Sequence, residues 1–215
     1  MQRIAGIDEA GRGPVIGPLV IAGVVIDASQ EDALIEWGVR DSKDLTPHRR
    51  NSLERQIRKL AEQVEVLEIS AKEIDAQRKL MRSLNVLEAE WMAQVLNRLN
   101  WQTAYVDASD VNAERYGRLI TTQLKTPKKI ISEHKADSAY PVVAAASIIA
   151  KVRRDQRIQE LHKAFGDFGS GYPNDPKTRK FLIDWIKSHD KFPDIVRQTW
   201  ETARGILTST RQRRL

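Results

Sequence analysis

Short apolar stretches separated by turn residues occupy the first third of the chain. Arg3–Ile7 is short and apolar, and Leu19–Ile26 is rich in valine and isoleucine, so both segments predict buried strands. Glycine and proline residues punctuate the connection between them, which indicates a hairpin. Further strands are predicted at Val64–Ile69, Thr103–Val106 and Lys129–Glu133.

Elsewhere in the chain, apolar residues recur at helical spacing. Thr46-Pro47 supplies an N-cap and a first-turn proline to a helix with Leu53 and Ile57 on one face. Ser70-x-x-Glu73 has the form of a capping box. Other helices are predicted around Asn85–Asn100 and Glu114–Leu124, from Pro141 to Gly166, from Asp175-Pro176 onward, and across Ile195–Ala203.

The order of these elements predicts an α/β fold in which helices cover the faces of a mixed sheet. A strand hairpin and a third strand come first, two helix–strand units follow, and the end of the chain is helical. We expect a main domain over residues 1–165, a helical C-terminal part over 166–207 packed on it, and a basic, flexible tail over 208–215. No exposed apolar stripe is evident, so we expect a monomer.

Composition narrows the class of protein. Of the 215 residues, 41% are hydrophobic and 30% are charged, as in ordinary globular domains. The longest apolar runs, near Val20–Ile26 and Val142–Ala150, are too short to cross a bilayer, and the N-terminus lacks the features of a signal peptide. The absence of cysteine excludes disulfides and zinc–thiolate sites and favours a cytoplasmic location. A net charge of +6 favours nucleic acid as a partner, although many basic proteins never bind one.

Four acidic residues stand at predicted strand ends or in the loop that follows. Asp8 and Glu9 close the first strand, Asp107 closes a later one, and Asp137 follows the strand that ends at Glu133. Taken singly, an acid in such a place is more often a turn residue or a helix cap. If the strands are neighbours, however, four carboxylates would repel one another unless divalent cations lay between them. Two such ions, about 4 Å apart, could activate water and stabilise a leaving 3′-oxygen, so the cluster points to phosphodiester hydrolysis.

Two glycine-rich loops are candidate substrate contacts. Gly11-Arg12-Gly13 is consistent with a plain hairpin turn, but glycines also let the backbone approach a sugar, and Arg12 has a forked donor set for phosphate. Tyr172 lies in the loop Gly169–Pro173, where it could be a packed aromatic residue. Alternatively, its ring could stack on a sugar or base while its hydroxyl bonds a 2′-OH, the group that distinguishes RNA from DNA.

Several basic residues have an ordinary explanation beside a functional one. Lys43 precedes a helix and is either solvated or a phosphate contact. Lys151, Arg153 and Arg154 are expected to form a solvated helical face. His134 and Lys135 are close in sequence to the last of the four acids and could assist proton transfer or product release, but a surface role is the simpler expectation.

Together, these motifs resemble the ribonuclease HII family over Ile4–Ala203, nearly the whole chain. The segment Phe165–Phe168 is more similar to archaeal members than to bacterial ones. The matching segments, in the family's order, are Gly6–Pro14, Asp41–Lys43, Tyr105–Asp107, His134–Asp137, Ala144–Lys151 and Gly169–Pro173.

The resemblance implies a ribonuclease H-like fold, with a mixed five-stranded sheet flanked by helices and a helical C-terminal subdomain. It implies a two-metal-ion endonuclease that cuts the RNA strand of RNA–DNA hybrids and nicks duplex DNA beside embedded ribonucleotides. The implied metal is Mg²⁺ or Mn²⁺, and the implied products carry 3′-hydroxyl and 5′-phosphate ends. By the same resemblance, the catalytic and metal-binding acids are Asp8, Glu9, Asp107 and Asp137, ribose recognition falls to Gly11, Arg12, Gly13 and Tyr172, and phosphate contacts fall to Lys43, Ser147 and Lys151.

The end of the chain departs from some archaeal relatives, which finish in a sliding-clamp-binding peptide with a glutamine and paired aromatics. Thr210–Leu215 contains no aromatic residue, so clamp binding is doubtful.

Three other classes of protein fit the sequence less well. Ribonuclease HIII carries an extra N-terminal domain, which the three residues before Ile4 cannot supply. A junction resolvase or integrase-like nuclease of the same fold would not need a residue that senses a 2′-OH. A noncatalytic protein that binds hybrids would not need all four acids.

Overall fold

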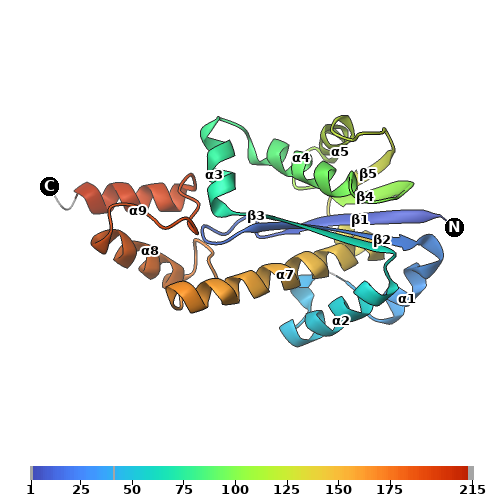
Figure 1. Ribbon diagram of the computed structural model, residues 1–215, viewed down its shortest axis with the longest axis horizontal. Helices are drawn as coiled ribbons and strands as arrows, with labels where there is room; N and C mark the ends of the chain where they lie inside the picture. The colour runs from blue at the N-terminus through green and yellow to red at the C-terminus, as the bar shows by residue number, and fades with distance from the viewer. Residues whose placement is uncertain (1, 41, 213–215) are drawn as a thin grey trace. The chain divides into compact units, whose positions relative to one another are not determined.

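The computed structural model describes residues 2–40 and 42–212 (Figure 1). The predicted strands are all present, as β1 (Arg3–Ala10), β2 (Leu19–Asp27), β3 (Gln63–Ile69), β4 (Thr103–Asp107) and β5 (Lys129–Glu133). The helices are α1 (Glu31–Glu36), α2 (Pro47–Leu60), α3 (Ala71–Lys79), α4 (Leu84–Leu96), α5 (Ala113–Thr122), α6 (Ala136–Ala139), α7 (Pro141–Phe165), α8 (Pro176–Ser188) and α9 (Glu201–Gln212), with short 3₁₀ turns η1 (Ala28–Gln30) and η2 (Ser42–Asp44).

The chain forms two compact units, each assembled from separate segments. The first unit takes residues up to 10, 20–67 and 83–153, and the second takes 11–19, 68–82 and everything from 154 onward. The second unit therefore contains more than the C-terminal segment from residue 166 that we expected from the sequence. Residues 208–212 of the expected tail continue α9, and residues 213–215 lie outside the described part of the chain.

The sheet has the strand order β3-β2-β1-β4-β5. β1 runs antiparallel to β2 and parallel to β4, and β4 runs parallel to β5, so the predicted mixed sheet is confirmed. Because β1 and β4 are parallel neighbours, with Ile7 opposite Val106, both strands end at the same edge of the sheet. This arrangement brings Asp8 and Asp107 to one edge.

In the first unit, helices cover both faces of the sheet (Figure 1). The core on one face combines residues of β2, α2 and the first half of α7. On the other face, Gly23 leaves room for α4, since an added Cβ would lie 2.8 Å from a methyl of Val95. At Gly6, an added Cβ would lie 2.1 Å from the Val142 carbonyl oxygen. Glycine at that position therefore allows the start of α7 to lie directly against β1.

In the second unit, a separate apolar core holds the helical segments together. It joins Val15 and Ile16 to Phe168, Leu182 of α8 and Ala203 of α9. Backbone hydrogen bonds from Val15 N (2.8 Å) and Ile16 N (3.2 Å) to Gly171 O hold the first loop to the later one. The two glycine-rich loops singled out in the sequence are therefore neighbours within this unit.

The helix starts were predicted well, with one exception. Thr46 and Asp175 cap α2 and α8, and the capping box of Ser70 and Glu73 opens α3. The last helix was predicted wrongly, because α9 begins at Glu201 and not near Ile195. The residues before it make tertiary hydrogen bonds instead of helical ones, among them the bond from Arg197 N to Val15 O (2.8 Å).

Candidate active site

Three of the four predicted acids converge in the first unit. Asp8 lies near the end of β1, Asp107 is the last residue of β4, and Asp137 lies in α6. One carboxylate oxygen from each lies within 4.8 Å of the others. Asp8 and Asp137 are buried, and Asp107 is half-buried. The prediction that the strand ends bring these acids together is correct for these three residues.

A strained turn carries Asp137 to the end of β4. Lys135 adopts a left-handed backbone conformation with φ of 57° just before α6. The backbone N–H of Ala136 then donates to Asp107 at 2.8 Å, and the N–H of Ala108 donates to Glu133 O at 2.9 Å. These bonds tie the turn to the two parallel strands. His134 and Lys135 are themselves exposed, in line with the surface role that we expected for them.

Asp8 is held by donors on both sides. The N–H of Glu9 donates to its carboxylate at 2.7 Å, and the hydroxyl of Ser147 on α7 is also hydrogen-bonded to it. Ser147 is buried, and its hydroxyl lies 2.9 Å from that of Ser42. Ser147, which we expected to contact phosphate, is therefore engaged in supporting an acid.

Arg50 is a buried residue of this support that the sequence did not reveal. Its guanidinium donates to the carbonyl oxygens of Ser42 (3.0 Å) and Leu45 (2.5 Å), which fixes the loop that precedes α2. Lys43 is exposed in the same loop, and Lys151 is half-buried on α7. Asp41 lies outside the described residues. Nothing in the sequence pattern marks Arg50, because it is one of several arginines on an otherwise polar helix.

The electrostatics of the cluster favour a cation. Burial raises the pKa of Asp8 well above its usual range, and the charges of Glu9 and Asp107 raise it further. The hydrogen bonds from Ser147 and from the Glu9 N–H lower this pKa but do not cancel the increase. Glu9 is half-buried and is not one of the three residues whose oxygens converge. Crowded carboxylate oxygens of this kind fit a hard divalent cation such as Mg²⁺ or Mn²⁺.

The second unit gathers the residues predicted to recognise the ribose, namely Gly11, Arg12, Gly13 and Tyr172. Gly11 has a φ of +93°, and a Cβ there would lie 2.5 Å from Arg154 Nε. A Cβ at Gly13 would lie 3.6 Å from the Tyr172 ring, so this ring lies beside the loop. Tyr172 is 44% exposed, which leaves part of the ring open to a ligand.

Two buried arginines, Arg154 and Arg197, contact this loop, and the sequence analysis predicted a supporting role for neither. Arg154, which we expected on a solvated helical face, is only 3% exposed, and its guanidinium lies 5.5 Å from the centre of the Tyr172 ring. The expectation was wrong because the side chain packs against Gly11. Arg197 is fully buried and donates to the carbonyl oxygens of Gly11 (2.6 Å), Arg12 (2.9 Å) and Gly17 (3.1 Å).

Burial and the like charge of Arg154 lower the pKa of Arg197 to about 9. Arg197 therefore remains charged at neutral pH, where its three carbonyl bonds are charge-assisted.

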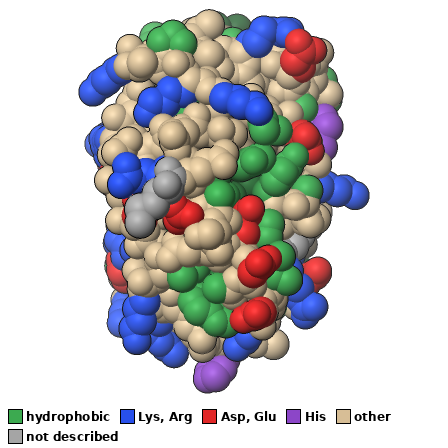
Figure 2. Space-filling view, turned by 90° about the vertical axis from the view of Figure 1, so that its right-hand side faces the viewer, with side chains coloured by type: hydrophobic (Ala, Val, Ile, Leu, Met, Phe, Trp, Pro, Cys, Tyr) green, Lys and Arg blue, Asp and Glu red, His purple; other side chains and the backbone are tan. Residues whose placement is uncertain are grey.

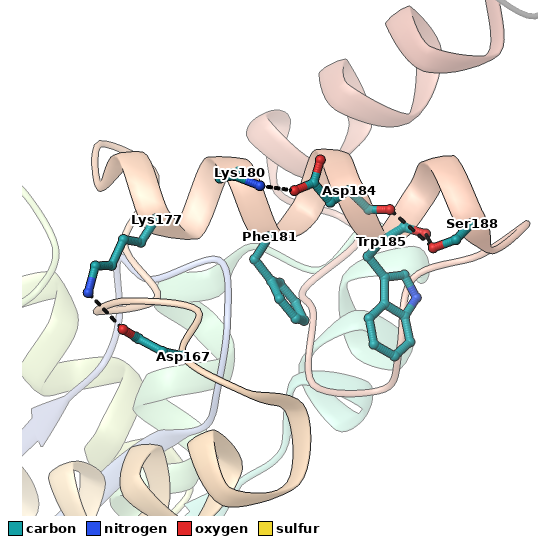
Figure 3. Close-up of a pocket in the computed structure, with 7 residues that line it drawn as sticks. All are labelled: Asp167, Lys177, Lys180, Phe181, Asp184, Trp185 and Ser188. Carbon is teal, nitrogen blue, oxygen red and sulfur yellow. Dashed lines mark hydrogen bonds and ion pairs between the residues drawn. The ribbon is translucent and has the colours of Figure 1, made fainter.

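A hollow of about 450 Å³ along α8 is a different kind of surface (Figure 3). Phe181 and Trp185 form part of its wall, Lys177 pairs with Asp167 at 2.7 Å, and Lys180 pairs with Asp184 on the same helix. None of the residues predicted for catalysis or substrate recognition line it.

Charge is also mixed on the face shown in Figure 2, where basic side chains lie around the margins and acidic and apolar ones lie nearer the middle. The net positive charge therefore does not form one continuous patch on that face. No helix in the described part of the chain is long and apolar enough to span a membrane.

Comparisons with known proteins agree with the fold and with the motifs. The family model for ribonuclease HII matches residues 5–203. Ribonuclease HII of Pyrococcus furiosus is 51% identical over 215 residues, which cover 99% of this chain and 95% of the relative. The crystal structure of ribonuclease H2 from Pyrococcus horikoshii superposes with a TM-score of 0.92 at 47% identity, covering 98% of this chain and 100% of that one.

A second solved structure, the PCNA:RNase HII complex from Archaeoglobus fulgidus, matches with a TM-score of 0.84 at 47% identity, covering 92% of this chain and 95% of that one. The similarity to archaeal members that the sequence suggested is thereby confirmed, as is the ribonuclease H-like fold. The chain belongs to the ribonuclease HII family and is a type 2 ribonuclease H, an endoribonuclease.

Proposed function

We propose that this enzyme hydrolyses the RNA strand of RNA–DNA hybrids and also nicks duplex DNA on the 5′ side of an embedded ribonucleotide, leaving 3′-hydroxyl and 5′-phosphate ends. The observation that carries the proposal is the convergence of carboxylate oxygens from Asp8, Asp107 and Asp137 within 4.8 Å. Membership of the ribonuclease HII family supports the proposal that this cluster carries out ribonuclease H chemistry.

The proposed ligands of Mg²⁺ or Mn²⁺ are the four acids Asp8, Glu9, Asp107 and Asp137. Two bound ions would supply activation of the attacking water and stabilisation of the leaving 3′-oxygen. The chain's own contribution is to orient the acids before substrate arrives. The Glu9 N–H and the Ser147 hydroxyl hold Asp8, and the Ala136 N–H holds Asp107, so that little reorganisation is needed.

Ribose recognition is proposed for the loop Gly11–Gly13 and for Tyr172. Support comes from the second unit, in which the Tyr172 ring lies against the loop and remains 44% exposed. The loop backbone would approach the ribose closely, and the tyrosine hydroxyl would bond the 2′-OH. Lys43, Ser147 and Lys151 are the proposed phosphate contacts, and Ser147 also supports Asp8.

The proposed partners are RNA–DNA hybrids and duplex DNA that contains ribonucleotides, bound by a monomer. The Archaeoglobus fulgidus relative has been solved in a complex with PCNA. The segment Thr210–Leu215 of this chain has no aromatic side chain, so we propose no clamp binding through that segment. Residues 213–215 of that segment lie outside the described part of the chain. The cytoplasmic location stays a prediction.

The test is cleavage of three labelled duplexes: a long RNA–DNA hybrid, duplex DNA with one ribonucleotide, and the matched all-DNA duplex. We expect Mg²⁺-dependent cleavage of the first two, inhibition by chelator, and no cleavage of the third. Cleavage of the hybrid alone would keep the carboxylate mechanism and remove the proposed nicking activity. Binding of the hybrid without cleavage would contradict the proposal and favour a noncatalytic hybrid-binding protein.

A further inference from the structure

A buried acid on α3 stands outside the catalytic cluster and within the second unit. Asp75 is only 4% exposed. Its carboxylate accepts hydrogen bonds from the backbone N–H groups of Gln198 (2.6 Å) and Thr199 (3.0 Å) and from the Thr199 hydroxyl (2.6 Å). A buried carboxylate with three such donors fixes the position of the backbone that supplies them.

The backbone that Asp75 fixes comes directly after Arg197. Arg197 uses its own N–H to bond Val15 O at 2.8 Å, and its guanidinium donates to the carbonyls of Gly11, Arg12 and Gly17. Arg197 thus holds both ends of the segment Gly11–Gly17, which contains the Gly11–Gly13 loop that is proposed to read the ribose. The antiparallel pairing of Ile16 with Val196 holds the residues before Arg197, and Asp75 holds the two residues that follow it, so both sides of Arg197 are fixed.

Charge adds to this geometric dependence. Burial and the guanidinium of Arg154 disfavour the charged form of Arg197, whereas Asp75 favours it. Replacing Asp75 by a neutral residue would weaken the backbone anchor and would also remove the acid that offsets the repulsion between the two arginines.

We propose that Asp75 is a positioning residue for ribose recognition, which acts through Arg197 on the Gly11–Gly17 loop without touching substrate. This inference rests on the proposed function of that loop. A displacement of about 1 Å in a recognition group can cost about 100-fold in rate. The expected effect of Asp75→Asn is therefore a loss of about 10- to 100-fold in cleavage at a single embedded ribonucleotide.

The experiment is a double-mutant cycle with Asp75→Asn, Arg197→Lys and the double variant. Single-turnover cleavage and substrate binding are measured below the unfolding temperature of every variant, on both the one-ribonucleotide duplex and the long hybrid. Both single variants should lose more on the duplex than on the hybrid, and the loss should fall on the cleavage rate more than on binding. Since the residues act in series, the double variant should lose little more than either single variant.

Two further variants make the result interpretable. Asp194→Asn removes an exposed acid of the same unit, which pairs with Lys72 at 3.0 Å, and should cleave like the parent. Thr199→Val removes one of the three donors to Asp75 and should show a smaller loss in the same direction, so it replaces Asp75→Asn if that variant does not fold.

Two outcomes would overturn the inference. The first is a folded Asp75→Asn protein that keeps the parental ratio of rates on the two substrates, whether neither rate falls or both fall equally, as a purely structural role predicts. Fully additive losses in the double variant would show that Asp75 does not act through Arg197. Failure of the parental protein to cut the one-ribonucleotide duplex would instead remove the proposed nicking function, and this inference with it.

Discussion

The acid cluster of the first unit and the buried arginines of the second, Arg154 and Arg197, both bury charge, but the charge is balanced differently in the two regions. In the acid cluster, oxygens of Asp8, Asp107 and Asp137 lie within 4.8 Å of one another, and burial together with neighbouring negative charges raises the pKa of Asp8. In the second unit, the Arg197 guanidinium donates to three carbonyl oxygens of the segment Gly11–Gly17. The acid cluster is stabilised fully only when a cation binds, whereas the charge of Arg197 is balanced by acceptors that the protein itself supplies.

The largest expected effect comes from the acid cluster. Asp107→Asn removes a charge from the cluster and should lower the cleavage rate on RNA–DNA hybrids by about 1000-fold or more. Asp110→Asn is the matched control, because Asp110 is a buried acid three residues later that pairs with Arg115 at 2.5 Å. The control should retain the specific activity of its folded fraction, and similar losses in the two variants would contradict the distinction between them.

Removal of the charge should destabilise the protein far more at Arg197 than at Arg154. Arg197→Met leaves three buried carbonyls without their donor and should lower the free energy of unfolding by about 3–5 kcal/mol. Arg154→Met should change it by less than about 1 kcal/mol, because Arg154 Nε and Nη2 are buried without a hydrogen-bond partner among the described residues. Urea unfolding of both variants measures the contrast. Equal destabilisation would show that Arg154 is held by more than its packing on Tyr172.

Loss of one hydroxyl should have a smaller effect. Tyr172→Phe keeps the ring beside Gly13 and the contact with Arg154 but removes the hydroxyl proposed to bond the 2′-OH. Cleavage at a single ribonucleotide should fall about 10-fold, the value of one hydrogen bond, with little change in substrate binding. Single-turnover rates and a binding titration separate the two quantities. Equal activity of the variant and the parent would remove the proposed sensing role of the hydroxyl.

The smallest expected effect is that of Asp8→Asn on the free energy of unfolding, and its sign should differ between chelator and Mg²⁺. Since burial, Glu9 and Asp107 raise the pKa of Asp8 in the folded protein, the folded state binds more protons than the unfolded state above the usual aspartate pKa. Stability is therefore lost as the pH rises through that window, and Asp8→Asn avoids the loss.

In chelator, Asp8→Asn should be more stable than the parent by about 1 kcal/mol at neutral pH, and the gain should shrink as the pH falls towards 4. Saturating Mg²⁺ should stabilise the parent more than the variant and reverse the order. Thermal unfolding with chelator and with Mg²⁺ measures both. A variant less stable than the parent in chelator would contradict the view that the acids repel one another.

The sequence was sufficient for the fold and for the acid cluster because both follow from local patterns. Apolar runs and caps located the strands and most helices, and acids at the ends of parallel strands must meet at one edge of the sheet. The supporting residues follow from no local pattern. Arg50, Arg154 and Arg197 look like ordinary basic residues, and their burial depends on carbonyls and glycines that only the folded chain brings near.

The same reason explains the error at the last helix. The segment Ile195–Trp200 has apolar residues at helical spacing. Two of its backbone N–H groups, however, donate to the carboxylate of Asp75, which lies far away in the sequence. These long-range bonds compete with helical ones, and spacing alone does not reveal them.

The most direct test of the central claim is to map the cut in duplex DNA that contains one ribonucleotide, using end-labelled strands and Mg²⁺. The proposed mechanism predicts a single cut on the 5′ side of the ribonucleotide, a 3′-hydroxyl on one fragment and a 5′-phosphate on the other. A cut on the 3′ side, or a product with a 2′,3′-cyclic phosphate, would contradict it, because such a product arises by attack of the 2′-OH and not of water.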